Sequence, residues 1–535
     1  MDSIASRKES VIDEKQETNA VEDVNAYIVK ADDRTFSQVA NPFLVFAMMV
    51  FGASTLLFGF DNNVISPIAA LEPFVRKYQG FNWSTGTYAF TARNQDLLFS
   101  LPLVGTIFGA WSASPIQRKF GRKWSVIGCY TVSIGGVFLQ LFAKNLAMFV
   151  IGRTWNGVGY GCAMAISPLY LSEIVPASLR GRAVSSQNIF TVFSGVIATI
   201  VVNCTSTMDG DKSYMIPLAV QSALPIVLIP FTIMLPESPV WLVSQGKVEQ
   251  ARKNLRAIRG FSDAEVDEEL SLIEESELRE REIGKDAKFW ELFDRQNLKR
   301  TVTASSLFSL NQISGIVLST TYATIFLEQI GVGNPFQLTV AASCCQLAGA
   351  IIGPFVVDSA GRRPVALIGM TILTIIDFIA GGLAFAENGR HSFALAIAVL
   401  SFLFNVVWTA SFYALSMLIP SEVANVRLRN HTMSYTVGWC QTTAVITTFA
   451  VPQITSAGAG NLGAKAYLIF GGCMVCILIF TFFMIPETKG LNFLQIDEMY
   501  ELGVPAWKWR AKTIASDNQM IETGENEDEK ESKQV

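Results

Sequence analysis

Two charged residues lie inside long apolar runs of the sequence, where a charge is unfavourable. Asp61 follows Phe58-Gly59-Phe60 deep in the first apolar run, and Arg153 lies early in the fourth. A carboxylate in such surroundings costs several kcal/mol unless it is paired, solvated or neutralised. We expect Arg153 to be its partner. The two residues then form either a static buried ion pair or a functional group of the protein.

Polar and aromatic side chains interrupt several of the other apolar runs. An amide carries both a donor and an acceptor, so it can bind a hydroxyl-rich ligand or bridge two helices. The amides are Gln187, Asn188, Asn311, Gln312, Gln346 and Gln441. The aromatic rings of Tyr322, Trp408 and Trp439 can stack on an apolar ligand face, or they can belong to the aromatic belts of a membrane interface.

The elements that position these residues are predicted to be membrane helices. Half of the 535 residues are hydrophobic and only 16% are charged, and the mean hydropathy is +0.35. About twelve runs of about 20 apolar residues recur along the chain, each long enough to cross the hydrocarbon of a bilayer. This pattern excludes a water-soluble enzyme. We expect an all-α membrane protein with twelve transmembrane helices.

One long polar stretch divides the apolar region into two parts. We expect a disordered N-terminal tail, a first six-helix half, a segment of linker helices, a second six-helix half and a C-terminal tail, at residues 1–40, 41–240, 241–297, 298–488 and 489–535. Short loops on one side keep most of the lysines and arginines, which places that side, both tails and the linker in the cytosol.

Three short motifs occur twice in the same order, which predicts two pseudo-symmetric halves. They are a Gly-Arg motif at Gly121-Arg122-Lys123 and Gly361-Arg362-Arg363, a glutamate seven residues before an arginine at Glu173 and Glu422, and a Pro-Glu motif at Pro236-Glu237 and Pro486-Glu487. Ion pairs between the helix ends that carry these motifs would form a two-state latch on the cytosolic side; alternatively, the arginines only set the topology. The candidate latch residues are Arg122, Glu173, Arg180 and Glu237 in the first half, and Arg362, Glu422, Arg429 and Glu487 in the second.

The repeated motifs and the fourth apolar run also carry a resemblance to a known family. Gly152-Arg153 with its following glycines, Pro168 to Ile174, Pro236 to Leu242 and Pro486 to Gly490 resemble the signatures of sugar porters of the major facilitator superfamily. The resemblance implies two six-helix halves around a central cavity, alternating access, and a role for Asp61 as proton acceptor with Arg153 as its partner. It also places the six amides at or beside sugar-contact positions.

Within this family the sequence is most similar to fungal alpha-glucoside permeases, of the maltose type. Tyr322 to Gln329 and Gly503 to Ala506 carry that likeness. The hexose carriers' fifth-helix glutamine is replaced by Asn188, and their seventh-helix asparagine by Val317, so a hexose pocket is not simply carried over. Arg118 replaces the aspartate of the first loop signature, which predicts a looser latch in that half.

We therefore expect a proton-coupled sugar importer, with an alpha-glucoside such as maltose as its cargo. The alternatives are a transporter or facilitator for a hexose, polyol or quinate-like acid, and a sugar sensor. We expect a monomer in the plasma membrane that binds sugar and protons and no nucleic acid. Asn82 begins a possible glycosylation sequon. No cluster of metal ligands, cofactor motif or catalytic histidine is evident, so no enzyme activity is predicted.

Overall fold

The computed structural model describes residues 42–81, 88–175, 177–259, 263–284, 288–330, 333–386, 391–424, 428–456, 459–489, 491, 495–496, 499–500 and 502–509. Within these ranges the chain folds into helices joined by short turns, and no strand occurs. The apolar runs seen in the sequence become the long helices.

The first half contains six membrane-length segments and one short helix. The first segment is made of α3 and α4, which meet at Ser54 and Thr55. The helices are α3 (Pro42–Ala53), α4 (Leu56–Ala69), the short α5 (Glu72–Tyr78), α6 (Ala92–Phe120), α7 (Arg122–Leu141), α8 (Leu146–Ile174), α9 (Ala177–Thr205) and α10 (Lys212–Met234).

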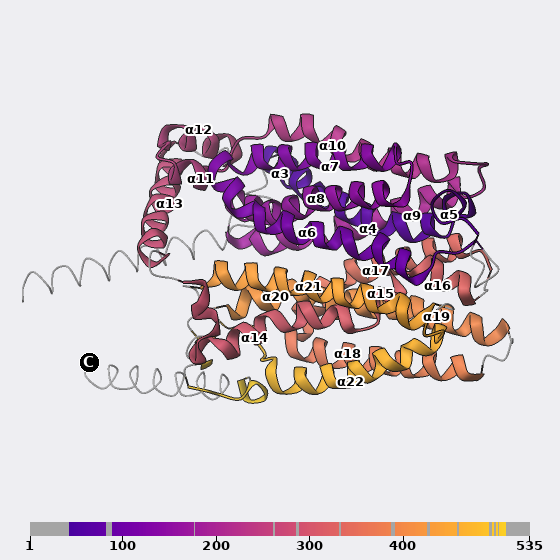
Figure 1. Cartoon of the computed structure of the whole chain (residues 1–535). Helices are drawn as coiled ribbons and strands as arrows, with labels where there is room; N and C mark the ends of the chain where they lie inside the picture. The colour runs from indigo at the N-terminus through magenta and orange to yellow at the C-terminus, as the bar shows by residue number, and fades with distance from the viewer. Residues whose placement is uncertain are drawn as a thin grey trace, which may run out of the picture.

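Short helices connect the two halves at one end of the molecule, on the left of Figure 1. They are α11 (Pro239–Ser244), α12 (Val248–Arg259), α13 (Asp263–Gly284) and the 3-10 turn η1 (Phe289–Phe293). Arg259 joins this linker to the first half, because its guanidinium donates to the carbonyl of Ile174 at 2.5 Å and pairs with Glu269 at 2.7 Å.

The second half repeats the arrangement, with two interruptions. Its first segment is broken into α14 (Arg295–Leu310), η2 (Asn311–Ile313), α15 (Ile316–Ser319) and α16 (Ala323–Ile330). Then follow α17 (Pro335–Ala360), α18 (Arg362–Ala386), α19 (His391–Trp408), the π-helical turn η3 (Thr409–Tyr413), α20 (Ala414–Val423), α21 (Arg429–Thr455), η4 (Gly463–Lys465), α22 (Ala466–Met484) and η5 (Ala506–Lys508).

The two halves lie side by side, with the first half above the second in Figure 1. α6 packs against α21, and α9 packs against α17. At the end away from the linker, Gln453 of α21 donates to the Asp96 carboxylate of α6 at 2.6 Å. The backbone N–H of Thr324 donates to the Ser66 hydroxyl at 3.1 Å across the same seam. The halves are thus closed against each other at that end.

Nine helices in the described ranges are long and apolar enough to cross a membrane. The three other segments of this length are α8, the broken α14–α16 and α21, which complete the predicted set of twelve. α8 carries Arg153 and Asn156, the broken segment carries Asn311 and Gln312, and α21 is rich in threonine. α8 and α21 are less apolar than the other nine because of such polar side chains, and the breaks divide the third segment into shorter helices.

Candidate functional site

Asp61 and Arg153 meet in the interior of the first half. Asp61 lies on α4 and Arg153 on α8, and their side chains are 1% and 3% exposed. Arg153 Nη2 donates to Asp61 Oδ2 at 3.1 Å. The structure therefore brings together the two charges that the sequence places in separate apolar runs.

Two amides complete the set of donors to Asp61, and the sequence reasoning did not name either. Asn156 Nδ2 and Gln221 Nε2 donate to Asp61 Oδ1 at 2.9 and 2.7 Å. Asn156 in turn accepts a hydrogen bond from the Ser133 hydroxyl at 2.5 Å. The signal was available, because Asn156 lies one helical turn after Arg153 on the same face, and Gln221 is an amide inside an apolar run.

The Asp61 carboxyl thus accepts hydrogen bonds from three donors, one of them a charged guanidinium. The guanidinium of Arg153 is less well satisfied: its Nε and Nη1 atoms are buried without a hydrogen-bond partner in the described part of the chain. Breaking a buried ion pair by removing one partner typically costs about 3 to 5 kcal/mol. Any change in the charge of Asp61 therefore alters the forces on α8 and α10 together.

Close helix packing fixes the position of Asp61. At Gly59, two residues before Asp61 on α4, an added Cβ would lie 1.9 Å from the carbonyl oxygen of Thr191 on α9. At Gly157 on α8, an added Cβ would lie 2.4 Å from the carbonyl oxygen of Pro102 on α6. Only glycine allows these backbones to approach so closely, so both positions hold the helices that carry the buried charges.

A second polar region surrounds the break in the first segment of the second half. The chain leaves η2 and turns at Gly315, whose φ of 85° is in the left-handed region that favours glycine. Asn311 Oδ1 accepts a hydrogen bond from Trp408 Nε1 at 2.7 Å, and Gln312 Nε2 contacts Cys440 Sγ at 3.7 Å. Two predicted amides and one predicted aromatic residue thus tie the break to α19 and α21.

A small polar cavity with about 10 Å³ of accessible volume lies between the two halves beside this break. Its lining comes from α4, the broken segment, α17 and α19, and consists of Asn63, Ser319, Thr320, Ala323, Thr339, Ala342, Ser343, Gln346 and Asn405. Gln346 is a predicted binding residue. Asn63 and Asn405 are amides in apolar runs that the sequence reasoning missed. A cavity of this volume holds about one water molecule, so it is far too small for a sugar in this structure.

The remaining predicted binding residues lie outside this lining. Tyr322 is buried at the closed end, where its hydroxyl donates to the Thr448 carbonyl at 3.0 Å and its ring lies 4.4 Å from that of Phe99. Gln187 is buried with its Nε2 atom unpaired in the described residues. Trp439 is 48% exposed and stacks on Tyr435. Asn188 is half-buried on α9 and Gln441 is buried on α21.

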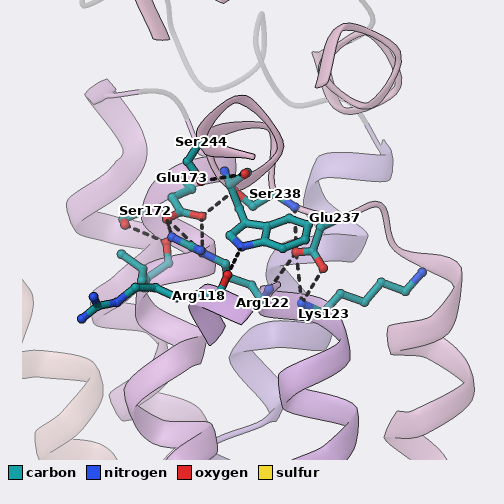
Figure 2. Close-up of polar contacts among 10 residues, drawn as sticks. Arg118, Arg122, Lys123, Ser172, Glu173, Glu237, Ser238 and Ser244 are labelled. Atoms are coloured by element: carbon teal, nitrogen blue, oxygen red, sulfur yellow. Dashed lines mark hydrogen bonds and ion pairs between the residues drawn. The ribbon is translucent and has the colours of Figure 1, made fainter. Parts of the chain in front are cut away.

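The candidate latch residues of the first half form one network at the linker end (Figure 2). Arg122 pairs with Glu173 at 2.7 Å, and the Ser238 hydroxyl donates to the other Glu173 oxygen at 2.5 Å. Glu237 accepts the backbone N–H groups of Arg122 and Lys123 at 2.9 and 3.2 Å, so it caps the start of α7. Burial raises the pKa of the Glu237 carboxyl, and the backbone donors of α7 partly oppose that shift.

The second half repeats this network residue for residue. Arg362 pairs with Glu422 at 2.8 Å, and the Thr488 hydroxyl donates to Glu422 at 2.5 Å. Glu487 accepts the backbone N–H of Arg362 at 3.0 Å and caps the start of α18 in the same way. The side chains of Arg180 and Arg429, and the whole of Asn82, lie outside the described residues.

The first-half network is not the looser one, although Arg118 replaces the aspartate there. In the second half, Asp358 occupies the corresponding position and lies 4.0 Å from Arg362. In the first half, the Arg118 carbonyl instead accepts the indole N–H of Trp241 at 3.0 Å. The central ion pairs are similarly short in the two halves, at 2.7 and 2.8 Å, so this structure shows no loosening of the first-half latch.

The duplicated six-helix bundle, the polar cavity between its halves and the buried ion pair define the class of protein as a membrane transporter with the major facilitator fold. Residues 45–500 match the family described as "Sugar (and other) transporter". The chain belongs to this sugar transporter family.

Known relatives and one solved structure agree with this assignment. The chain is 30% identical over 508 residues to the major facilitator-type transporter ecdD of Aspergillus rugulosus, covering 91% of this chain and 93% of that protein. It is 29% identical to the general alpha-glucoside permease of Saccharomyces cerevisiae, covering 93% and 82%. The proton:xylose symporter XylE from E. coli matches the fold with a TM-score of 0.70 at 20% identity, covering 86% and 99%.

Proposed function

We propose that the protein imports a sugar together with a proton, and that its cargo is an alpha-glucoside such as maltose. The observation that carries the coupling is the buried carboxyl of Asp61, which is surrounded by one guanidinium and two amide donors from α8 and α10. Such a group can exist in two charge states, and each state favours a different arrangement of the helices around it.

The proposed coupling step is a proton transfer from water on one side of the membrane to a carboxylate oxygen of Asp61. While Asp61 is ionised, it holds Arg153 and keeps α4 fixed against α8. Protonation removes the negative charge, so the guanidinium is released and α4 can move with respect to the cavity, which Asn63 of the same helix lines. The proton leaves to the opposite side after the halves have rocked.

The energy available to this step is sufficient for accumulation. One charge moving down the membrane potential supplies about 2.3 kcal/mol per 100 mV, and each pH unit adds about 1.4 kcal/mol. With ordinary gradients this supports sugar accumulation of roughly a thousandfold.

The polar lining of the cavity supports a sugar as the cargo. Gln346, Asn63 and Asn405 offer both donors and acceptors to hydroxyl groups, and an unpaired buried polar group would cost about 1 to 3 kcal/mol. A sugar of two rings needs a wider cavity than the present one, so we assign the structure to a contracted stage of the cycle. Gln187, Asn188, Gln441, Trp408 and Trp439 then join the site only as it opens.

The proposed topology follows the distribution of basic residues. We place the linker end and both terminal tails in the cytosol and the closed end on the outer side. The membrane is proposed to be the plasma membrane, and the protein a monomer. The two halves span 41–240 and 298–488, and the segment 241–297 joins them. The sequon at Asn82 is then on the outer side, where glycosylation is possible.

The two linker-end networks are proposed to act as the latch. Each ties three helix ends of one half through an arginine–glutamate pair and a glutamate cap. They would hold the helix ends of each half together while the cytosolic side is closed, and weaken when that side opens.

Uptake of labelled maltose, glucose and a polyol in a transporter-null yeast tests this proposal, with and without an uncoupler. We expect maltose uptake that the uncoupler abolishes. The Asp61→Asn variant should lose accumulation but keep maltose counterflow, which needs no net proton movement. Uncoupler-resistant accumulation that Asp61→Asn leaves unchanged would contradict the proposed proton coupling. Uptake of glucose or the polyol without uptake of maltose would show that the cargo is not an alpha-glucoside.

A further inference from the structure

A second aspartate is buried in the membrane region, and the mechanism above does not use it. Asp377 lies in the middle of α18 and is 0% exposed. Both of its carboxyl oxygens lack a hydrogen-bond partner in the part of the chain that the structure describes. Asp61, by contrast, has three donors in the other half.

No lysine, arginine or histidine among the described residues forms an ion pair with Asp377. The titratable groups within electrostatic range are Tyr467 and Cys473, both on α22 and both neutral at physiological pH. The other elements packed against α18 are α17, α19, η3, η4 and α20, and α18 itself begins with two arginines. Apart from the cysteines and Tyr413, the charged or titratable residues of these elements lie toward the helix ends, and they are Asp358, Arg362, Arg363, His391, Glu422 and Lys465. Of these, η4 carries the lysine. That residue, Lys465, lies 4.9 Å from the ring of Phe385, about two helical turns from Asp377.

A carboxylate without donors or a counter-charge is strongly disfavoured in such a site. A protonated carboxyl is neutral and costs far less to bury. The enclosed site therefore suits a neutral carboxyl far better than an ionised one.

Asp377 also lies beside the turn at Gly315, which interrupts the first segment of the second half. A Cβ at Gly315, where the chain takes its left-handed turn, would lie 3.7 Å from Asp377 Oδ1. On the other side, an added Cβ at Gly471 of α22 would lie 3.3 Å from Asp377 Cβ. The carboxyl is thus enclosed between the break and α22.

The break is connected to both the cavity and the closed outer end. The Ser319 hydroxyl, at the end of α15, shares a hydrogen bond with Tyr467 at 2.8 Å, and Ser319 lines the cavity. Just beyond, Tyr322 and Thr324 make the contacts with Phe99 and Ser66 that close the outer end. If that end opens by a movement of residues 315–324, we expect the movement to uncover Asp377, because the turn at Gly315 lies against its carboxyl.

From these relationships we propose that Asp377 is a second proton-binding site: it holds a proton while the outer end is closed and releases it when residues 315–324 swing away and admit water. The carboxyl loses its proton to that water and regains one before the end closes again. The inference rests on the proposed alternation of access. It uses neither the identity of the cargo nor the role of Asp61.

Infrared spectroscopy of the purified full-length protein in detergent tests the proposal without any transport measurement. At neutral pH the wild type should show the carbonyl stretch of a protonated carboxylic acid, which Asp377→Asn removes and Asp61→Asn leaves in place. Asp377→Glu should shift that band, and it provides the answer if the asparagine variant does not fold. The absence of a band lost in Asp377→Asn and shifted in Asp377→Glu would overturn the proposal.

A variant that props the outer end open tests the release step. Ser66 is 1% exposed in the closed seam, so Ser66→Trp cannot be accommodated unless the halves separate there. We expect the Asp377 band to weaken in Ser66→Trp at neutral pH and to return on acidification. A band that persists unchanged in this variant would show a permanently neutral acid, and the proposed proton release would be wrong even if sugar–proton import holds.

Discussion

Glu237 caps the helix that begins at Arg122: its Oε1 atom accepts the Arg122 backbone N–H at 2.9 Å, although the two residues are 115 positions apart in the chain. Glu487 makes the same contact with Arg362 at 3.0 Å. The repeated Gly-Arg and Pro-Glu motifs are therefore two sides of one contact. The glycine leaves room for the glutamate, since a Cβ at Gly121 would lie 2.3 Å from Glu237 Oε2.

Loss of this cap should destabilise the protein. We expect Glu237→Ala to lower the free energy of unfolding by about 1 to 2 kcal/mol, since it leaves the first N–H groups of α7 without an acceptor. Thermal unfolding followed in detergent measures the effect. Glu237→Gln keeps an acceptor oxygen and is the control; an equal loss in both variants would show that the charge, and not the cap, is responsible.

The packing of α4 on α9 should not tolerate a methyl group at Gly59. An added Cβ there meets the Thr191 carbonyl oxygen at 1.9 Å, so Gly59→Ala should cost at least about 1 to 3 kcal/mol and displace Asp61. At Gly128 on α7 a Cβ meets nothing within 4 Å. Gly128→Ala should leave stability unchanged or raise it by up to about 1 kcal/mol. Similar unfolding temperatures for the two variants would contradict the packing argument.

The Asp96–Gln453 hydrogen bond should help to keep the outer end closed. Gln453→Ala removes the donor and leaves a buried carboxylate, a change of about 1 to 3 kcal/mol. This corresponds to a shift of roughly tenfold or more toward the outward-open state. The fraction of outward-open protein is measured by introducing a cysteine into the cavity and following its labelling by an impermeant reagent added outside. The control is Thr442→Ala, because the Thr442 hydroxyl bonds only within its own helix in the described structure; equal labelling rates would refute the gate.

The cavity amides should contribute to sugar affinity. Gln346→Ala and Asn405→Ala each remove a donor and an acceptor from the lining, so we expect KM for the transported sugar to rise about tenfold with little change in stability. Thr131→Ala, on the exposed face of α7, should leave KM unchanged. Unchanged KM in both cavity variants would move the binding site elsewhere in the molecule.

The sequence predicted the membrane-spanning helices and their duplicated arrangement, because hydrophobic runs of bilayer length and repeated motifs are local signals. The major facilitator fold followed from the resemblance of those motifs to the sugar porters. Arg153, a charge early in the fourth apolar run, was named as the partner of Asp61. The sequence reasoning did not identify Asn156, Gln221, Asn63 or Asn405, because which amides converge depends on helix rotation and packing.

Two features of the second half also escaped the sequence reasoning. The break at Gly315 lies in a run that looks continuous, since a single glycine is common in membrane helices. Asp377 is a charge in an apolar run, and the rule that singled out Asp61 applies to it equally. The lack of a hydrogen-bond partner for its carboxyl in the described structure, on which the proposed proton site rests, is visible only in three dimensions.

The central claim is that the charge of Asp61 couples proton movement to sugar movement. Sugar-induced proton flux into proteoliposomes, recorded with a trapped pH indicator at zero membrane potential, tests it most directly. Wild-type protein should acidify the lumen when maltose is added outside, whereas Asp61→Asn should exchange labelled maltose at a comparable rate without any acidification. Acidification by Asp61→Asn equal to that of the wild type would contradict the account.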